Sequence, residues 1–582
     1  MFEPDHASAE PRDSNARWQQ SLAVDPRGRR WRTIATQRRV LVVAGTVTSA
    51  MRLLAILPVL ESDPRIQVVF THDADSPSVL LAGVAELLNT LRCNVISWSR
   101  ACALRFDLIL TASEKDRVRE LDGPSVLFPH GAGFQKYDVV HRGVAGLGPQ
   151  HLLDDEKAVH AAIALAHPEQ RDLVAASCPP VLDRAVVVGD PCVDVMLAEE
   201  HRRSRYRDAL GVAAGQKLVV LTSTWGSQSL LGRAPDLPER VLAALPFDGW
   251  RCCLLTHPGI AAVHGHRQLE AWLANATEMG LMTVPTGRRW EPVLLSADCV
   301  IADQGSMALY AAALDVPLLL AGGRPPTTVP SSPVAELAGR ARHVDAPEDL
   351  REQILSTIAE HQPGRYGDLA ARTFAEPGSS AARLRKLLYG LIDLVEPAGP
   401  ATLGAGEMPV VLRGRVAAFL VTAVVVDGVL SVEREPVTSV AAEHVRRPDQ
   451  HLVAHALDSA AELLQVADVV YTTVDAGHSC PDESLRWAAM TFEQWPRIAV
   501  AVRLVSADRC IAVTRNRLGL VFSLGRDGTA RPGFDPLLLA SAAYVGHRAV
   551  RPGVGSLALD VAGQTWQITI TNLTDGGPEP AH

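Results

Sequence analysis

Short segments made almost wholly of apolar residues alternate with amphipathic segments from residue 39 onward. Three of the apolar segments are "RVLVVAG" (39–45), "IQVVFT" (66–71) and "FDLILTA" (106–112). A strand that is apolar along its whole length is buried on both faces, which is typical of a parallel sheet covered by helices on each side. The pattern therefore predicts an α/β fold with a parallel sheet.

The segments between these strands have helical spacing. In "TSAMRLLAILPVLES" (48–62) we expect a helix with Thr48 or Ser49 as its N-cap, kinked or shortened by Pro58. A second helix is expected in "SVLLAGVAELLNTL" (78–91), and "PSVLFPH" (124–130) reads as a further strand.

The same alternation restarts with "RAVVVGD" (184–190). Four further strands are expected, at 217–224, 251–258, 298–305 and 316–323, with helical segments such as "GSMALYAAAL" (305–314) between them. Two consecutive Rossmann-like, doubly wound halves follow from this order. Ligands of such sheets bind beyond the carboxyl ends of the strands, so we expect a site in the cleft between the halves.

The rest of the chain differs in composition from these two halves. Residues 410–582 combine strands such as "LGLVFSLG" and "TWQITITNL" with helical stretches near 450–467 and 536–547, which indicates a smaller α+β domain. The expected division is a polar, basic leader (1–38), an N-terminal acceptor half (39–180), a C-terminal nucleotide-donor half (181–394), a Pro/Gly-rich linker (395–409) and the α+β domain (410–582).

Composition narrows the class of protein. A chain of 582 residues is too long for one core, and a net charge of −9 argues against a nucleic-acid binder. Nine scattered cysteines without a Cys-x-x-Cys pair favour neither a disulfide framework nor a metal site. With no signal peptide and no apolar run of membrane-spanning length, we expect a cytoplasmic protein with at most peripheral contact between its basic leader and a membrane.

Small or reactive residues follow nearly every strand of the two halves. In a parallel sheet the carboxyl ends of the strands lie along one edge, so these clusters are expected to converge. The clusters are Gly45-Thr46, His130-Gly131, Gly189-Asp190-Pro191, Thr222-Ser223-Thr224-Trp225, His257-Pro258 and Asp303-Gln304-Gly305-Ser306.

The last cluster leads directly into a helix, whose free N–H groups and positive dipole end suit a phosphate. Ser306 would cap this helix or bond a phosphate oxygen, and Asp303 or Gln304 would hold a ribose hydroxyl. The candidate donor-binding residues are Gly189, Asp190, Ser223, Thr224, Trp225, Asp303, Gln304, Gly305 and Ser306.

His130 and His257 are the candidate acid–base residues, because a histidine titrates near neutrality and can take a proton from an attacking hydroxyl. One comes from each half and both are expected to face the cleft. Gly131 and Lys136 beside His130 are the candidate acceptor-binding residues, and the lysine would add positive charge for a phosphate.

In this order the motifs resemble the CDP-glycerol glycerophosphotransferase family, the teichoic-acid polymerase type, which has a GT-B glycosyltransferase fold. The resemblance covers roughly residues 40–390. The chain also resembles a set of poorly characterised actinobacterial proteins. The resemblance to the family is carried by "PHGAGFQK" (129–136), "GDPCVD" (189–194), "STWGS" (223–227), His257-Pro258 and the Asp303/Ser306 loop.

The resemblance implies attack of an acceptor hydroxyl on the β-phosphate of a CDP-activated polyol, with His130 as base and CMP as leaving group. His257 and the helix that begins at Ser306 would stabilise the diphosphate charge. This would be a step of cell-wall polymer biosynthesis, with the nucleotide-diphosphate donor as substrate and no tightly bound cofactor.

Three alternatives stay open at this point. The same fold and helix would serve a glycosyltransferase or a sugar-nucleotide epimerase, and the chain carries Pro129, Cys192 and Gly226 where the family has tryptophan or basic residues. That loss of positive charge favours a catalytically inactive protein that binds a nucleotide or a partner. "HDADS" (72–76) contains an Asp-x-Asp, which we interpret as an exposed loop rather than a metal site, and no phosphate-binding Gly-x4-Gly-Lys-Ser/Thr motif occurs.

Overall fold

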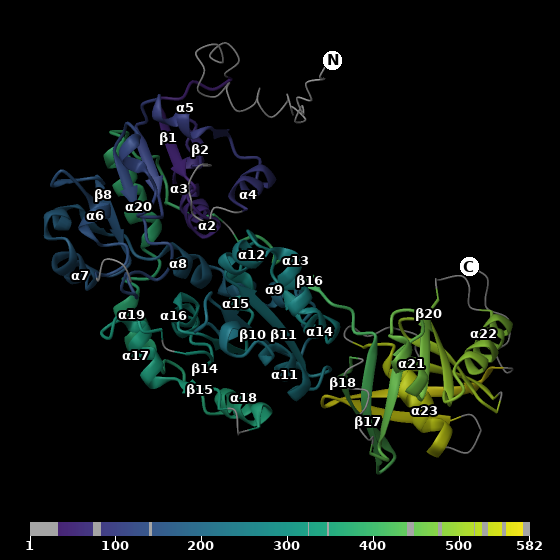
Figure 1. Ribbon diagram of the computed structural model, residues 1–582. Coiled ribbons are helices and arrows are strands. Elements are labelled where there is room, and N and C mark those ends of the chain that lie inside the picture. Colours follow the sequence, from purple (N-terminus) through teal and green to yellow (C-terminus); the bar gives the residue numbers. More distant parts are fainter. Residues whose placement is uncertain are drawn as a thin grey trace, which may run out of the picture.

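The structure is a computed structural model (Figure 1). It describes residues 33–73, 83–138, 143–323, 325–345, 349–404, 406–438, 447–474, 480–516, 518–525, 534–549 and 555–573. Most of the predicted leader, 1–32, lies outside these ranges, as does Asp75 of the Asp-x-Asp sequence.

The first sheet is parallel throughout, as its continuous apolar strands predict. Its order is β3-β2-β1-β4-β5-β8-β9. The strands are β1 (Arg38–Val43), β2 (Ile66–Thr71), β3 (Val95–Ile96), β4 (Leu108–Thr111), β5 (Ser125–Leu127), β8 (Ala162–Leu165) and β9 (Ala185–Val187).

Helix α2 (Val47–Ile56) follows β1, but it begins earlier than expected. Its N-cap is Thr46, whose hydroxyl accepts from the Ser49 N–H while the Ser49 hydroxyl accepts from the Thr46 N–H in return. Pro58 ends this helix and opens the short helix α3 (Pro58–Glu61), since proline is tolerated in a first turn. The predicted N-caps Thr48 and Ser49 are therefore wrong, whereas the break at Pro58 is confirmed.

Two elements that the sequence assigned to the second half pack with the first sheet instead. Strand β9 pairs with β8, and helix α20 (Ser380–Leu391) buries Leu384 and Leu388 against the core of the first sheet. The chain therefore crosses between the two units three times: once after β9, once before α20, and once more between Leu403 and strand β16 (Leu412–Arg413) of the second sheet. The prediction placed only the first crossing, and too early, because local patterns do not show which sheet an element joins.

The second sheet has the order β15-β14-β13-β10-β11-β12-β16 and is parallel except for β16. Counted from the first strand of each sheet, the first six strands of both sheets have the same order, 3-2-1-4-5-6, which is the Rossmann order with a switch point beside the first strand. The seventh strand lies at opposite edges, with β9 beside β8 and β16 beside β12. The strands are β10 (Lys217–Ser223), β11 (Trp250–Thr256), β12 (Met282–Thr283), β13 (Cys299–Ala302), β14 (Leu318–Leu320), β15 (Arg342–His343) and β16 (Leu412–Arg413).

Helices cover both faces of this sheet and bury two separate cores. Helices α8 (Pro191–Ala198) and α16 (Ser306–Ala313) pack on one face. Helices α11 (Leu237–Ala244) and α18 (Leu350–Ala359) pack on the other. The units built on the two sheets are called the first unit and the second unit below.

The C-terminal part is a closed nine-stranded barrel, which corrects the predicted α+β domain. The ring closes because β17 pairs with both β18 and β19 and because β18 pairs with β24. The strands are β17 (Ala418–Val426), β18 (Val429–Pro436), β19 (Gln450–His455), β20 (Val469–Thr473), β21 (Val500–Ser506), β22 (Arg509–Thr514), β23 (Gly519–Leu524), β24 (Gly555–Val561) and β25 (Gln564–Asn572).

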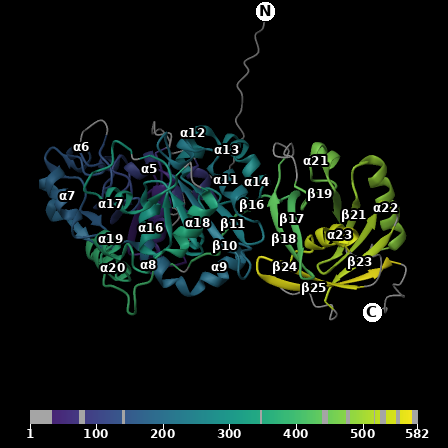
Figure 2. The same cartoon turned by 90° about the horizontal axis from the view of Figure 1, so that it is seen from below.

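Helix α23 (Leu538–Ala549) lies inside the ring of strands (Figure 2). Its residues Leu539, Ala540 and Ala542 are fully buried, and together with Phe522 and Val502 they form the barrel core. A helix was expected near 536–547, whereas the predicted helical stretch near 450–467 is strand β19 followed by helix α21 (Ala461–Val466).

A buried arginine joins the barrel to the second unit. Arg434 on β18 is 1% exposed and forms ion pairs of 2.6 Å with Asp248 of the second unit and with Asp535 of the barrel. Its guanidinium also lies over the rings of Phe247 and Phe419.

In the described part of the chain, no helix is both long and apolar enough to cross a membrane.

Candidate active site

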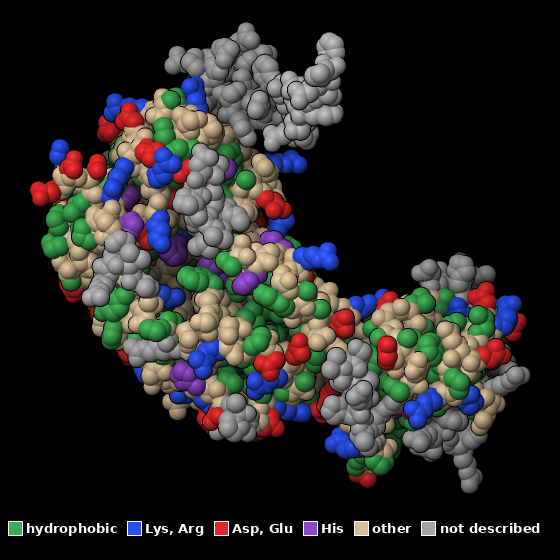
Figure 3. Space-filling view, viewed as in Figure 1, with side chains coloured by type: hydrophobic (Ala, Val, Ile, Leu, Met, Phe, Trp, Pro, Cys, Tyr) green, Lys and Arg blue, Asp and Glu red, His purple; other side chains and the backbone are tan. Residues whose placement is uncertain are grey.

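A cavity of about 600 Å³ lies between the first and second units. The space-filling view shows the molecule hollowed at this place, with histidine side chains in the hollow (Figure 3). The cavity is lined by the loops that follow β1, β4 and β5 in the first sheet and β10, β11 and β13 in the second. Both switch points therefore face one cavity, as the strand-end clusters predicted.

The loop after β5 reaches across the cavity to the second unit. The Ala132 N–H donates to the Ser306 hydroxyl oxygen at 3.1 Å, and Lys136 forms a β-bridge with Thr328. A Cβ atom on Gly131 would lie 2.5 Å from Ser306 Oγ, so only glycine permits this approach. The predicted acceptor-side residues thus contact the helix that was predicted to bind the donor.

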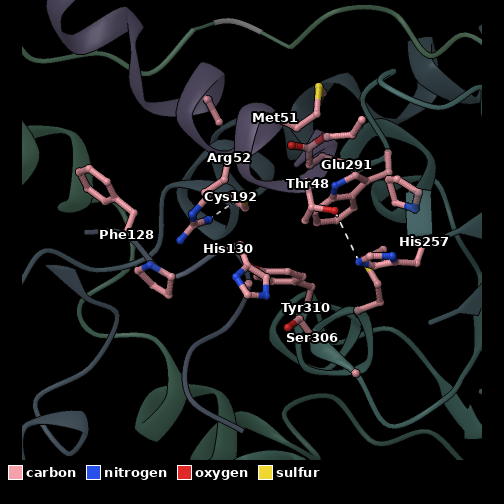
Figure 4. Close-up of a pocket in the computed structure, with 18 of the residues that line it drawn as sticks. Thr48, Met51, Arg52, Phe128, His130, Cys192, His257, Glu291, Ser306 and Tyr310 are labelled. Carbon is pink, nitrogen blue, oxygen red and sulfur yellow. Dashed lines mark hydrogen bonds between the residues drawn. The ribbon is translucent and has the colours of Figure 1, made fainter. Parts of the chain in front are cut away.

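His130 lies at the centre of the cavity (Figure 4), where much of its side chain is open to the cavity and protein surrounds the cavity on both sides. One ring N–H donates to the Ala112 carbonyl at the end of β4, which leaves the other ring nitrogen free to accept a proton. Desolvation by the surrounding protein lowers the His130 pKa, and the Glu114 carboxylate opposes that shift. The neutral form of His130 is therefore favoured, with one ring nitrogen as a hydrogen-bond donor and the other as an acceptor.

His257 differs from His130 in the hydrogen bonds that its ring makes. Its Nδ1 accepts a hydrogen bond from the Gly259 N–H at 2.9 Å and so caps helix α12 (Pro258–His264). Burial, together with the nearby His130 and Lys136, lowers the His257 pKa to about 4. A neutral ring with Nδ1 as acceptor carries its proton on Nε2, which lies 3.5 Å from the Thr48 hydroxyl (Figure 4). His257 is a hydrogen-bond donor toward the cavity.

Lys136 is close enough to three site residues to influence their charge. Burial is the main cause of the lowered pKa of His130 and His257 and of the raised pKa of Asp303, and the Lys136 ammonium group lowers the pKa of all three. Its side chain also lines the cavity. A cation at this position suits a phosphate ligand, as the sequence predicted.

Asp303 is engaged within the protein. Its Oδ2 accepts hydrogen bonds from the Thr224 N–H and hydroxyl, at 2.6 and 2.7 Å, and from the Leu230 N–H at 3.1 Å. These bonds fix the loop after β10 against the loop after β13, across the switch point of the second sheet. In the structure, Asp303 and Thr224 hold these loops together, so the Asp303 oxygen Oδ2 is engaged within the protein.

Gln304 is 6% exposed, lines the cavity, and has a side-chain oxygen without a hydrogen-bond partner. The next residue, Gly305, is the N-cap of α16 and supplies no side-chain oxygen, so the first N–H groups of this helix are left without a cap. Ser306 accepts from Ala132 and keeps its own hydroxyl proton to donate. The free N–H groups of α16 and the Ser306 hydroxyl are donors of the kind that can bind an anion, whereas the Gln304 oxygen can only accept a hydrogen bond.

The remaining predicted donor residues divide into two groups. Trp225, which is 57% exposed, and Ser223 line the cavity. Gly189 and Asp190 are absent from its lining: Gly189 has a φ of +84° where the chain passes Ala375 and Ser380, and Asp190 caps helix α8 through the Cys192 and Val193 N–H groups. These two residues organise the crossing between the units.

Asp190 also binds a residue that the sequence analysis missed. Arg52 of α2 forms a buried ion pair of 2.9 Å with Asp190 and donates to Cys192 Sγ at 3.0 Å, and the Tyr310 hydroxyl donates to Asp190 at 3.2 Å. Burial opposes the charge on Arg52, but Asp190 outweighs burial and raises the Arg52 pKa. A guanidinium thus lies beside Cys192, the position at which the family pattern has a basic residue.

Three further features of the cavity were not predicted. Glu114, Thr48 and the loop 284–291, which carries Arg288, Arg289 and Glu291, all line it. The isolated arginine in the apolar stretch "MRLLAIL" was the available signal for Arg52, whereas Glu114 lies in an ordinary polar loop.

Among the described residues, no group of three or more His, Cys, Asp or Glu is arranged to hold a metal, and Asp73 of "HDADS" pairs with Arg117 at 3.0 Å.

No protein-family model and no curated protein sequence matches this chain. Solved structures similar to it include the H444N variant of the wall teichoic acid polymerase TagF, with 11% identity and a TM-score of 0.44 over 62% of this chain and 90% of that one. A UDP-GlcNAc 2-epimerase of Methanocaldococcus jannaschii has 14% identity and a TM-score of 0.39, over 60% of this chain and all of its own. HepE of Anabaena, solved with UDP and glucose, has 13% identity and a TM-score of 0.35, over 61% of this chain and all of its own.

Proposed function

We propose that this protein is a GT-B-type transferase that moves a glycerophosphate-like or glycosyl group from a nucleotide-diphosphate donor to a hydroxyl acceptor. The observation that carries the proposal is the meeting of His130 with the uncapped start of α16 in one cavity, through the 3.1 Å hydrogen bond from Ala132 to Ser306. A base from the first unit and an anion site from the second are the two parts that such a transfer requires.

The donor diphosphate would lie at the start of α16, where the Ser306 hydroxyl and the first N–H groups donate to its oxygens. Lys136 and the neutral His257 Nε2–H would bind further oxygens, and these contacts strengthen as negative charge develops on the leaving group. Gln304 and Trp225 would contact the ribose or the base.

His130 would take the acceptor hydroxyl proton as the acceptor oxygen bonds to the β-phosphorus of the donor. The bond from that phosphorus to the bridging oxygen breaks, the pair of electrons stays with the leaving nucleotide monophosphate, and the proton stays on His130 until solvent removes it. For a sugar nucleotide, the new bond forms at the anomeric carbon and the nucleoside diphosphate leaves.

Calorimetric titration with CDP, UDP, CDP-glycerol and UDP-sugars tests donor binding, and CMP or UDP release tests transfer. We expect His130→Ala to lower turnover by about 10²- to 10⁴-fold while the nucleotide Kd changes less than about threefold. His266→Ala, the same substitution at an exposed histidine outside the cavity, is the matched control.

Two results would contradict the proposal. The absence of nucleotide binding at millimolar concentration would exclude the transferase and the epimerase alike. Nucleotide binding without any product, in wild type and His130→Ala alike, would favour the inactive nucleotide-binding protein.

A further inference from the structure

Helix α2 is apolar on two faces, one buried in the core of the first sheet and one that packs on the margin of that core and also lines the cavity. Ala50, Leu53 and Ile56 are at most 1% exposed and lie in the core of the first sheet. A helix at a water-exposed surface usually carries polar residues on the other face. Here that face and the turn that follows it are formed by Met51, Leu54, Ala55 and Pro58, which are half-buried and line the cavity.

Other elements add apolar residues to the lining. These are Val195 on α8, Val284 and Pro285 in the loop after β12, and Leu91 after α4 (Val84–Thr90). We call these eight residues the apolar slot.

The apolar slot is closed by a direct contact between the units. Gly287 has a φ of +80°, and a Cβ atom there would lie 2.8 Å from Leu87 Cδ1 of α4. Arg289 and Glu291 of the same loop pair with each other at 3.4 Å, and Glu291 is 5% exposed. Arg288, next to Gly287, is exposed, lines the cavity and forms none of the ion pairs found among the described residues, so it adds one positive charge at the edge of the apolar slot.

The apolar slot continues into the catalytic centre. Thr48, which contacts His257, lies one turn before Met51 and Arg52 on the same helix (Figure 4). A ligand that fills the apolar slot can thus present a polar group to His130 and His257 without leaving the cavity.

We propose that the apolar slot binds an uncharged, hydrophobic part of the hydroxyl acceptor. This inference rests on the proposed function. Five of the eight residues come from the first unit, which also carries the base, whereas the free polar groups suited to a nucleotide, Gln304 and the start of α16, belong to the second unit. The acceptor would be a hydroxylated ring or chain compound whose apolar body lies against Met51 and Val284, rather than a free sugar or polyol.

A fluorescence titration with 4-methylumbelliferone, a flat apolar bicycle with one hydroxyl, tests the apolar slot. Met51→Gln in the first unit and Val284→Thr in the second make the apolar slot more polar at nearly constant shape, and we expect each to raise the Kd of the probe about tenfold. Met490→Gln, at a methionine 68% exposed on the barrel, is the matched control and should leave the Kd unchanged. CDP and UDP titrations of the same proteins should agree within about twofold.

The two kinds of failure are distinguishable. If both variants weaken CDP or UDP as much as the probe, the apolar slot holds the donor base and the inference is overturned. It is overturned as well if the probe binds wild type and both variants equally. If no nucleotide binds wild type but the probe behaves as expected, the apolar slot stands and the proposed transferase fails.

Discussion

Burial lowers the pKa of His130, and three charged residues act on the same ring: Glu114 raises the pKa, whereas Arg52 and Lys136 lower it. Arg52 is held in its buried pair with Asp190, so Glu114 and Lys136 are the two neighbours whose charge can be removed without breaking that pair. Since the net pKa lies below the ordinary value of 6.5, the proposed base would be neutral at pH 7 and would be protonated only in acid.

Charge removal at the two neighbours should therefore move the pH profile in opposite directions. We expect the acid limb of kcat/KM for nucleotide release to lie below pH 6.5 in wild type. It should shift to lower pH in Glu114→Gln and to higher pH in Lys136→Met. Shifts in the same direction would show that the limb does not report His130.

Gly131 offers a second test at the scale of single atoms. Gly131→Ala places a Cβ 2.5 Å from Ser306 Oγ, so either this hydroxyl rotates away and loses the hydrogen bond from Ala132, or the loop that carries His130 withdraws from α16. We expect turnover to fall more than tenfold with little loss of stability. In the Ser306→Ala background the nearest remaining atom is Cβ at 3.4 Å, so Gly131→Ala should cost much less there. Equal losses in both backgrounds would exclude this steric coupling.

Among the elements, α2 and α8 are held together by the buried pair Arg52–Asp190. Asp190→Asn keeps an oxygen for the helix cap but leaves the Arg52 guanidinium buried without a counter-charge. We expect a loss of about 3–5 kcal/mol in the free energy of unfolding, measured with urea. The double variant Arg52→Met/Asp190→Asn should recover part of this loss, and a single-variant cost under about 1 kcal/mol would show that only the cap matters.

The sequence predicts elements best where burial dictates the pattern. Continuous apolar strands such as β1 and β10 identified both sheets, and the parallel order then placed His130, His257 and Ser306 at one edge. The barrel was not predicted, because the pairing of β18 with β24 joins residues more than 120 positions apart, such as Leu430 and Leu559. Likewise, no local pattern shows that the Asp303 carboxylate accepts its hydrogen bonds from Thr224, or that Arg52 forms an ion pair with Asp190.

For the whole molecule, Arg434 is the joint between the second unit and the barrel. Arg434→Met leaves Asp248 and Asp535 without their common partner, so we expect a loss of about 3–5 kcal/mol and separate unfolding of the barrel in calorimetry. Arg351→Met removes the exposed ion pair with Glu433 across the same joint and should change stability by less than about 1 kcal/mol. If the two substitutions have similar effects, the contact between the second unit and the barrel is stabilised by packing rather than by the buried ion pairs of Arg434.

The segment between α20 and the barrel is part of the cavity rather than a free tether. Leu403 packs on the core of the first unit, the Gly406 N–H donates to Glu199, and Gly404 and Glu407 line the cavity. The chain then adds β16 to the edge of the second sheet before it enters the barrel. The two units therefore do not end at α20. If the barrel were replaced by another domain, the cavity would be conserved only if the new domain were joined after Arg413.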